Sequence, residues 1–263
     1  MRMSSDVLVE VCADSVASAV AAERGGAARI ELCGGLSEGG ITPSAGLIEM
    51  TRAAVSIAIR VMIRPRGGDF FYDEDEFRTM QRDIELAKEL RTDGVVLGIL
   101  DLEGNVDVDR TRKLVDLAHP LGVTFHRAFD MTSDLNRALE DICAAGADRV
   151  LTSGGERSAV EGQAVIKRLV EQAGDRIAIM AGSGIKPENA CSVIEQTGAR
   201  EIHVGLRSVA QSPMRQRNPR ITLGSSEGQE YQRFLVLEEN VARLCRTVQE
   251  RAPQEKDCAR QDS

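Results

Sequence analysis

Residues 57–100 read IAIRVMIRPRGGDFFYDEDEFRTMQRDIELAKELRTDGVVLGIL, and this stretch carries the pattern that decides the fold. An apolar run at 57–64 is followed by an amphipathic segment at 73–91, with acidic residues in its first turn, and by a second apolar run at 93–100. These periods predict a strand, a helix and a strand. A unit of this kind joins two parallel strands through a crossover helix.

The same alternation extends in both directions from this unit. Short apolar runs predict further strands at 7–12, 28–34, 122–129, 148–154, 176–184 and 200–205. Helical patterns lie between them at 15–27, 42–56, 107–119, 132–145, 158–173 and 186–197, and a last helix is predicted within 227–251. Eight such units in 263 residues predict an α/β fold, a single-domain (β/α)8 TIM barrel over 7–251, with a polar, disordered tail at 252–263. An open doubly wound sheet is less favoured, because no GxGxxG motif follows the first strand.

Composition and charge exclude several functional classes. The net charge is −8 and the most basic segment, 212–220, is short, so no nucleic-acid partner is expected. No apolar stretch approaches the ~18 residues of a membrane span. A strand pattern begins by residue 7 and leaves no room for a signal peptide, so we expect a cytoplasmic protein without a membrane partner.

Strand parity predicts a charged barrel interior. Alternate residues of each strand face the helices, and the β-branched residues suit that outer layer. The opposite parity puts these side chains inside: Glu10, Cys12, Arg29, Glu31, Cys33, Arg60, Arg64, His126, Glu201 and His203. Buried charges must pair or line a wet pocket. They form either a structural ion-pair network or a functional site, and the second is favoured because several fall at strand C-terminal ends, where barrel active sites lie.

Three loops at that end carry candidate anion-binding groups. RPRGGDF (64–70) follows the third strand, TFHRAFD (124–130) the fifth and AGSGI (181–185) the seventh. Guanidinium groups suit a carboxylate or phosphate, and backbone N–H groups of a glycine turn can hold a phosphate, although Gly-Ser-Gly can equally be a tight turn. The anion-binding candidates are Arg64, Arg66, Arg127, Gly182, Ser183 and Gly184, and the supporting residues are Asp69, Asp130, Glu201 and His203.

Two of the six cysteines stand apart. Cys12 and Cys33 end adjacent strands with the same parity, so their sulfurs are predicted to lie close together at the barrel mouth. Two soft ligands of this kind suit Cu(I), although buried inert thiols are the commoner fate of cysteine. Cys143 and Cys191 fall within helical patterns, and no CxxC pair of a zinc finger is present.

These motifs together resemble the CutC family of copper homeostasis proteins. The resemblance rests on VEVCADS, RIELCGGLSEGGITPS, MIRPRGGDF, VTFHRAFD, RVLTSG and SPMRQRN, and it spans about residues 7 to 250. It implies a TIM barrel, a cytoplasmic location (and a nuclear one if the source is eukaryotic), self-association into a homo-oligomer and Cu(I) binding through cysteines, which match Cys12 and Cys33.

Three functions are compatible with these observations. The first is copper homeostasis, with Cu(I) held by Cys12 and Cys33. The second is an enzyme acting on a small anionic or phosphorylated substrate at the C-terminal barrel face, with His126, Glu10 and Glu31 as catalytic acid–base groups. The third is a non-catalytic scaffold. Copper homeostasis is the preferred hypothesis and the enzyme is the alternative.

Overall fold

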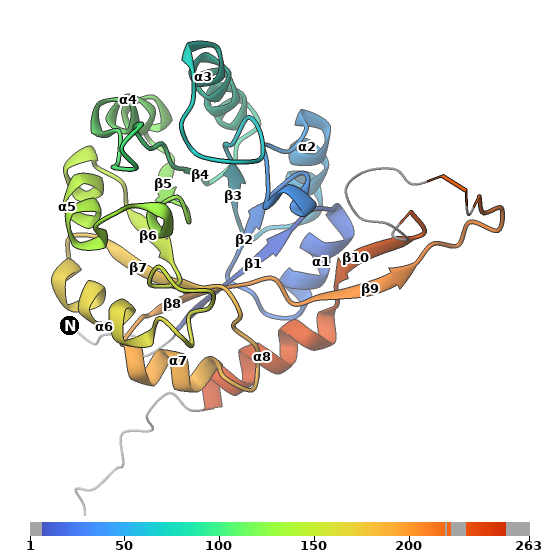
Figure 1. The fold of residues 1–263 in the computed structure, drawn as a ribbon. Helices are drawn as coiled ribbons and strands as arrows, with labels where there is room; N and C mark the ends of the chain where they lie inside the picture. Colours follow the sequence, from blue (N-terminus) through green and yellow to red (C-terminus); the bar gives the residue numbers. More distant parts are fainter. Residues whose placement is uncertain (1–6, 219, 222–229, 251–263) are drawn as a thin grey trace, which may run out of the picture.

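A closed barrel of eight parallel strands forms the centre of the molecule (Figure 1). The computed structural model describes residues 7–218, 220–221 and 230–250, so the tail predicted at 252–263 lies outside the described residues. Each strand pairs in parallel with the next, and the first pairs with the eighth to close the ring. The strands are β1 (Leu8–Ala13), β2 (Arg29–Leu32), β3 (Ala58–Met62), β4 (Gly94–Leu97), β5 (Gly122–Phe125), β6 (Arg149–Thr152), β7 (Ala178–Gly182) and β8 (Glu201–Val204). The prediction of a TIM barrel is confirmed.

Helices surround the barrel and follow the strands in turn (Figure 1). They are α1 (Val16–Arg24), α2 (Ala45–Ala54), α3 (Glu74–Glu89), α4 (Val108–Ala118), α5 (Leu135–Ala145), α6 (Gln163–Ala173), α7 (Ala190–Thr197) and α8 (Glu238–Glu250), with short 3-10 turns η1 (Leu36–Glu38) and η2 (Phe129–Met131). Among the described residues, every helix is too short or too polar to cross a membrane.

Helix α3 shows how the local sequence sets an element. The Asp73 side chain accepts the Glu76 N–H and the Glu76 side chain accepts the Asp73 N–H, which forms a capping box at its start. Its buried residues Phe77, Met80 and Ile84 recur at helical spacing and face the barrel. Burying each such side chain contributes about 1.5–3 kcal/mol, so packing rather than propensity holds the helix in place.

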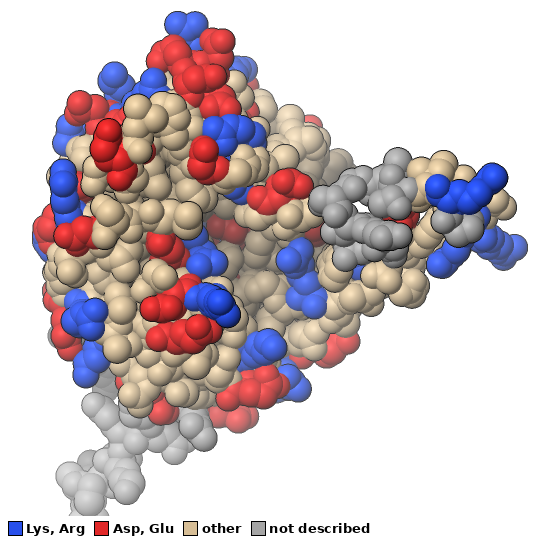
Figure 2. Space-filling model, viewed as in Figure 1, with Lys and Arg blue, Asp and Glu red and all other residues tan. Residues whose placement is uncertain are grey.

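A two-stranded antiparallel hairpin, β9 (Arg207–Gln211) and β10 (Gln232–Val236), projects from the barrel after β8 (Figure 1). These two strands are not expected from the sequence. Their residues are largely exposed or half-buried, so the alternation of buried and polar positions that marks a strand is weak there. Lys and Arg side chains gather near the far end of this projection (Figure 2), where Arg215 and Arg217 are exposed.

The register of the barrel places the charged side chains inside, as parity predicts. Glu10 is paired with Arg29 on one side and with His203 on the other, and Cys12 is paired with Glu31. The alternate residues of the same strands are fully buried against the helix layer, among them Val11, Ile30, Leu32, Ile59 and Val61. The apolar core therefore lies between strands and helices, and the barrel interior is left for polar chemistry.

Candidate functional site

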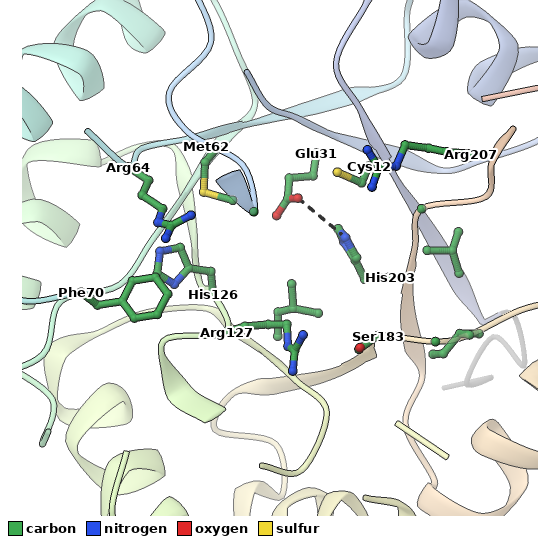
Figure 3. Close-up of a pocket in the computed structure, with 16 residues that line it drawn as sticks. Cys12, Glu31, Met62, Arg64, Phe70, His126, Arg127, Ser183, His203 and Arg207 are labelled. Atoms are coloured by element: carbon green, nitrogen blue, oxygen red, sulfur yellow. Dashed lines mark ion pairs between the residues drawn. The ribbon is translucent and has the colours of Figure 1, made fainter. Parts of the chain in front are cut away.

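A pocket of about 260 Å³ opens at the carboxyl ends of the barrel strands. In Figure 3, Cys12, Glu31 and His203 lie on one wall, and Arg64 and His126 lie on the opposite wall. We call this space the mouth pocket. Its complete lining is Cys12, Glu31, Gly39, Met62, Arg64, Phe70, His126, Arg127, Leu151, Ser183, Gly184, Ile185, His203, Val204, Gly205 and Arg207.

A buried ion-pair network of Glu10, Arg29, Arg149 and Glu201 lies outside this lining, deeper in the barrel. Arg29 bonds Glu10 through Nε and Glu201 Oε2 through Nη2 at 2.8 Å. Arg149 Nη2 donates to Glu201 Oε1 at 2.7 Å, and its Nε bonds the same carboxylate. For these four residues the arrangement is that of a structural network. Glu201 supports the barrel and does not line the mouth pocket.

Glu10 and His203 connect the network to the mouth pocket. Glu10 Oε1 lies 2.9 Å from His203 Nδ1, and Glu10 is fully buried. Burial alone would raise the pKa of Glu10, but the His203 hydrogen bond and the Arg29 charge hold it at about 2. Burial also opposes a charge on His203, yet Glu31, Cys12 and Glu10 around it keep its pKa well above the usual value. The imidazole is therefore held in a fixed orientation with Nε2 toward Glu31, 3.7 Å from Oε2.

The thiols of Cys12 and Cys33 lie 4.0 Å apart, as strand parity predicts. Cys33 Sγ lies 3.4 Å from Glu31 Oε2, and Cys12 reaches the mouth pocket while Cys33 is buried behind it. The hydrogen bond with Cys33, with further help from His203, lowers the pKa of Cys12 to about 5, whereas the pKa of Cys33 is raised. Burial raises the pKa of Glu31 to about 8. We refer to Cys12 and Cys33 as the thiol pair.

The donor atoms around the thiol pair fit a soft metal ion. Two groups of three residues each bring one ligand atom per residue within 4.8 Å of the others. The first group is Cys12, Glu31 and Cys33, and the second is Glu10, Glu31 and His203. Two sulfurs side by side are the donor set that soft ions such as Cu(I) prefer, and the 4.0 Å separation is too long for a disulfide bond. The sulfurs, rather than the carboxylates, would hold such an ion, and His203 lies beside them with its Nε2 3.7 Å from Glu31 Oε2.

Arg64 lies in the mouth pocket, where the sequence predicts an anion-binding group, whereas Arg66 does not line it. Arg64 lines the mouth pocket, but its Nη1 and Nη2 atoms donate to the carbonyls of Glu38, Gly40 and Gly68 at 2.8, 2.9 and 2.7 Å. Arg66 lies outside the pocket lining. Its guanidinium bonds Glu76 Oε1 at 2.5 Å, Asp69 Oδ1 at 3.0 Å and the Phe71 carbonyl at 2.7 Å, and so ties the loop to α3. Asp69 is exposed and belongs to this loop clamp.

Arg127 and Asp130 organise the neighbouring loop. Asp130 is buried and accepts the N–H groups of Ser153 at 3.0 Å and Gly155 at 3.0 Å, as well as the Thr152 hydroxyl at 2.5 Å. Arg127 Nε donates to Asp130 Oδ2 at 2.8 Å. Its guanidinium still lines the mouth pocket with 43% of the side chain exposed, so it can meet a ligand at the rim.

His126 faces the mouth pocket from β5 and is buried. Its Nδ1 accepts the Ala128 N–H at 3.1 Å, and its ring lies 4.9 Å from the Phe70 ring. Burial, reinforced by the Arg64 charge, lowers the pKa of His126 to about 3, so the ring is neutral near pH 7. A neutral ring with Nδ1 already occupied acts as a hydrogen-bond donor through Nε2.

The turn after β7 reaches the rim of the pocket. Ser183 and Gly184 line it and have left-handed backbone conformations, with φ of 76° and 71°. Gly182 ends β7 just beneath, where an added Cβ would meet the Leu151 side chain. The Ser183 hydroxyl donates to the Arg157 carbonyl at 2.9 Å, which fixes the turn to the preceding loop. Both interpretations of this segment, turn and anion cradle, remain compatible with its place.

Sequence reasoning missed two groups of this region. Alternation along β6 places Arg149 inside the barrel, as it does the charged residues of the other strands. The segment DRVLTSG (148–154) therefore contains the pattern that predicts an interior Arg149. Arg207 lines the pocket because the unpredicted hairpin begins there. No local sequence pattern marks Arg207 as a pocket residue.

Comparison with known proteins identifies the relatives of this chain. The family model for the CutC family matches residues 7–208. The chain belongs to the CutC family. It is 51% identical over 219 residues to the human copper homeostasis protein cutC homolog, covering 83% of this chain and 80% of the relative. The CutC family protein of Chromobacterium violaceum is 48% identical over 228 residues, covering 87% and 92%. The crystal structure of the Streptococcus agalactiae copper homeostasis protein CutC superposes with a TM-score of 0.72 at 36% identity, over 75% of this chain and 97% of that one.

This CutC-family membership agrees with the family resemblance of the sequence motifs. The matched range contains every barrel strand and all of the mouth pocket lining, because both end by residue 208. The human and Streptococcus agalactiae relatives carry copper homeostasis in their names, and in this chain the ligand atoms of Cys12, Glu31 and Cys33 lie within 4.8 Å of one another.

Proposed function

We propose that this protein serves copper homeostasis by binding Cu(I) at the thiol pair. The observation that carries the proposal is the 4.0 Å separation of the Cys12 and Cys33 sulfurs at the barrel mouth. Thiolates are soft ligands and favour Cu(I) over hard cations. The copper homeostasis names of the human and Streptococcus agalactiae relatives support the same assignment.

The thiol pair is buried, which limits access to the two sulfurs. Cys12 is 8% exposed and Cys33 is 1% exposed, and Cys12 is the sulfur that lines the mouth pocket. His203 and Glu31 lie beside the sulfurs and orient them, in the way that groups around a metal site hold its ligands. A buried, fixed pair of sulfurs differs from the exposed thiols that hand copper directly from one protein to another.

The test is an anaerobic Cu(I) titration against a competing chelator. The wild-type protein is expected to bind about one Cu(I) per chain, as a single pair of soft ligands predicts. A Cys12→Ser/Cys33→Ser variant should lose this binding, and a matched Cys143→Ser/Cys191→Ser variant should keep it, because those thiols lie on α5 and α7. Equal binding by the wild type and the Cys12/Cys33 variant would overturn the proposal.

A second candidate function is catalysis on a small anionic substrate at the C-terminal barrel face. The observation that favours it is the lining of the mouth pocket, which brings Arg64, Arg127, Arg207 and His203 around one small space. Copper binding by two sulfurs does not require such a set. In this role Glu31 is the acid–base group that lines the pocket, whereas Glu10 lies outside the lining and orients His203. Binding of phosphate or small organic anions by the Cys12→Ser/Cys33→Ser variant tests it.

We propose a cytoplasmic location for the protein. Cys12, Cys33, Cys143, Cys191 and Cys245 are free thiols, as is usual where the surroundings are reducing. Fractionation of the native source with detection of the protein tests this, and recovery from a secreted fraction would contradict it.

We also propose self-association. Val209 and Phe234 are paired across the hairpin, and both are exposed, at 54% and 36%. A two-stranded hairpin is marginally stable alone, and contact with a second copy would cover this apolar pair. Light scattering should give a mass above 28.5 kDa, and a Val209→Asp/Phe234→Asp variant should bring it down to the monomer value.

A further inference from the structure

One wall of the mouth pocket carries hydrogen-bond donors that nothing in the described residues satisfies. His126 Nε2 and Arg64 Nε are buried and have no partner there, and both residues line the pocket. They are 4% and 6% exposed. A buried donor without a partner is costly, about 1–3 kcal/mol for each group, so its presence at a pocket wall points to a ligand that completes it.

The hydrogen bonds around His126 decide which of its nitrogens carries the proton. Nδ1 accepts the Ala128 N–H at 3.1 Å, so Nδ1 has no proton and the neutral ring carries it on Nε2. Nε2–H is therefore a donor and not a base. The ring is held in place by Phe70, whose centroid is 4.9 Å away, and its edge lies against Gly98, where an added Cβ would be 2.6 Å from Nδ1.

Arg64 is held just as firmly beside it. Nη1 and Nη2 are occupied by the carbonyls of Glu38, Gly40 and Gly68, and the guanidinium lies 4.9 Å over the same Phe70 ring. Nε–H and the second N–H of Nη2 are the donors of this group that no carbonyl occupies, and Nε is buried without a partner among the described residues. Arg64 and His126 thus share Phe70 as a common support and appear next to each other on the pocket wall in Figure 3.

We propose that Arg64 and His126 form a donor pair for the carboxylate of a small organic acid, on the pocket wall opposite Cys12 and His203. The inference rests on the second candidate function and names its substrate class. Two N–H groups on two rigid side chains match the two oxygens of a carboxylate. The positive charge of Arg64 supplies attraction, and neutral His126 adds a hydrogen bond without adding a second charge that would have to be balanced.

The rest of the pocket agrees with a ligand of this kind. Its volume of about 260 Å³ fits an acid of a few carbon atoms. Met62, Phe70 and Leu151 supply apolar contacts for the carbon chain. The Glu31 Oε1 atom on the facing wall is also buried without a partner among the described residues, and it can accept a hydrogen bond from a hydroxyl group at the second carbon of the acid. The inferred ligand is therefore a short carboxylic acid, and a 2-hydroxy acid uses the most groups of the pocket.

A phosphate ester would use a different part of the pocket. A phosphate group takes several donors around three oxygens, and the Ser183–Gly184 turn with Arg127 and Arg207 at the rim is the place that offers them. The donor pair offers two buried atoms without a partner among the described residues, Arg64 Nε and His126 Nε2. Carboxylate and phosphate therefore predict different residues, which makes the two distinguishable by mutation.

The experiment measures binding of pyruvate, L-lactate and inorganic phosphate by calorimetry to the full-length protein. The variants are His126→Phe, which keeps an aromatic ring but removes the donor, and His119→Phe, the same change at an exposed position outside the pocket. The Cys12→Ser/Cys33→Ser variant is measured alongside. We expect pyruvate or lactate to bind the wild type, the His119 variant and the cysteine variant alike, and the His126 variant about tenfold or more weakly, as loss of a hydrogen bond to a charged group predicts.

A second readout uses the unmodified protein. The chain has three histidines, so the Nε2–H signal of His126 can be identified in a ¹⁵N imidazole NMR spectrum as the one that persists in both His119→Phe and His203→Phe. Pyruvate should shift this signal and phosphate should leave it in place. This readout decides the question even if the variant does not fold.

The remaining outcomes separate the inference from the candidate function beneath it. Phosphate binding that is indifferent to His126→Phe, without carboxylate binding, overturns the donor pair and leaves the small-anion function at the β7 turn. Carboxylate binding that is equal in His126→Phe and does not move the Nε2–H signal also overturns the donor pair. Absence of binding by all three probes overturns the inference and the second candidate function together, and leaves the copper proposal to its own titration.

Discussion

Replacement of Arg29 by methionine tests whether the barrel interior is held by ion pairs. Arg29 is the cation between two carboxylates, Glu10 and Glu201, and the side chains are 5%, 0% and 14% exposed. Methionine keeps much of the length of arginine but removes the charge. Glu10 then retains His203, and Glu201 retains Arg149, so each carboxylate loses one of its buried partners.

The expected loss is large because the charges are buried. Breaking a buried ion pair from one side costs about 3–5 kcal/mol. In a chain of this size each kcal/mol lowers the melting temperature by about 2–4 °C, so Arg29→Met should lower it by roughly 6–20 °C. The matched control is Arg243→Met, which breaks an exposed pair with Glu188 whose side chains are 59% and 64% exposed. An exposed pair contributes about 0–1 kcal/mol.

Thermal unfolding followed by circular dichroism measures both variants against the wild type. The account predicts a clear drop for Arg29→Met and a small or negligible one for Arg243→Met. Equal melting temperatures for the two variants would refute the reasoning, because they would show that the interior charges contribute no more than a surface pair.

Three further predictions concern pH and packing. The imidazole of His126 takes up a proton below about pH 6.5 in the unfolded state, whereas the buried ring does so only near pH 3, so the unfolded state is stabilised relative to the folded state as the pH falls between these values. The midpoint of urea unfolding should therefore fall more steeply with acid in the wild type than in His126→Phe. Parallel pH profiles of the two proteins would argue against a buried neutral ring. Glu10, with its pKa held at about 2, contributes stability that is present above pH 4.5 and lost as the pH falls toward 2, so Glu10→Gln should be less stable than the wild type at pH 7 and approach it in acid. Gly94→Ala would place a Cβ 2.6 Å from the Gly122 carbonyl oxygen and should cost about 1–3 kcal/mol in urea denaturation, whereas Gly46→Ala meets no atom within 4 Å and should be neutral or stabilising; equal effects would contradict the packing.

The architecture could be predicted because each strand carries its own signal. Alternation of short apolar runs with helical periods is repeated along the chain, and the right-handed crossover rule leaves few other arrangements. Parity then places Glu10, Cys12 and Glu31 inside, since a strand offers only two faces. The hairpin at 207–211 and 232–236 escaped prediction because most of its residues are exposed or half-buried, and Val236 at its end is its one buried residue.

The partners of the charged side chains were less predictable. RPRGGDF (64–70) shows two guanidinium groups, but nothing in it shows that Arg64 is occupied by carbonyls of the η1 loop, Glu38 and Gly40, which are more than twenty residues away. Arg66 looked equivalent in the sequence and binds Glu76 of α3 instead. Hydrogen-bond partners depend on distances between loops, and a single sequence does not contain those distances.

The proximity of the thiol pair followed from two neighbouring strands of the same parity, so it could be predicted. The place of His203 beside it required the barrel to close, because β8 and β1 are 193 residues apart at the Glu10 contact. Closure is a property of the whole chain and is invisible in any local motif.

The most direct test of the copper proposal is the X-ray absorption spectrum at the copper edge of full-length protein loaded with one equivalent of Cu(I). The account predicts sulfur as the dominant neighbour of copper, contributed by Cys12 and Cys33, and loss of that sulfur signal in the Cys12→Ser/Cys33→Ser variant but not in Cys143→Ser/Cys191→Ser. A first shell of nitrogen and oxygen alone, or a sulfur signal unchanged in the Cys12/Cys33 variant, would contradict it.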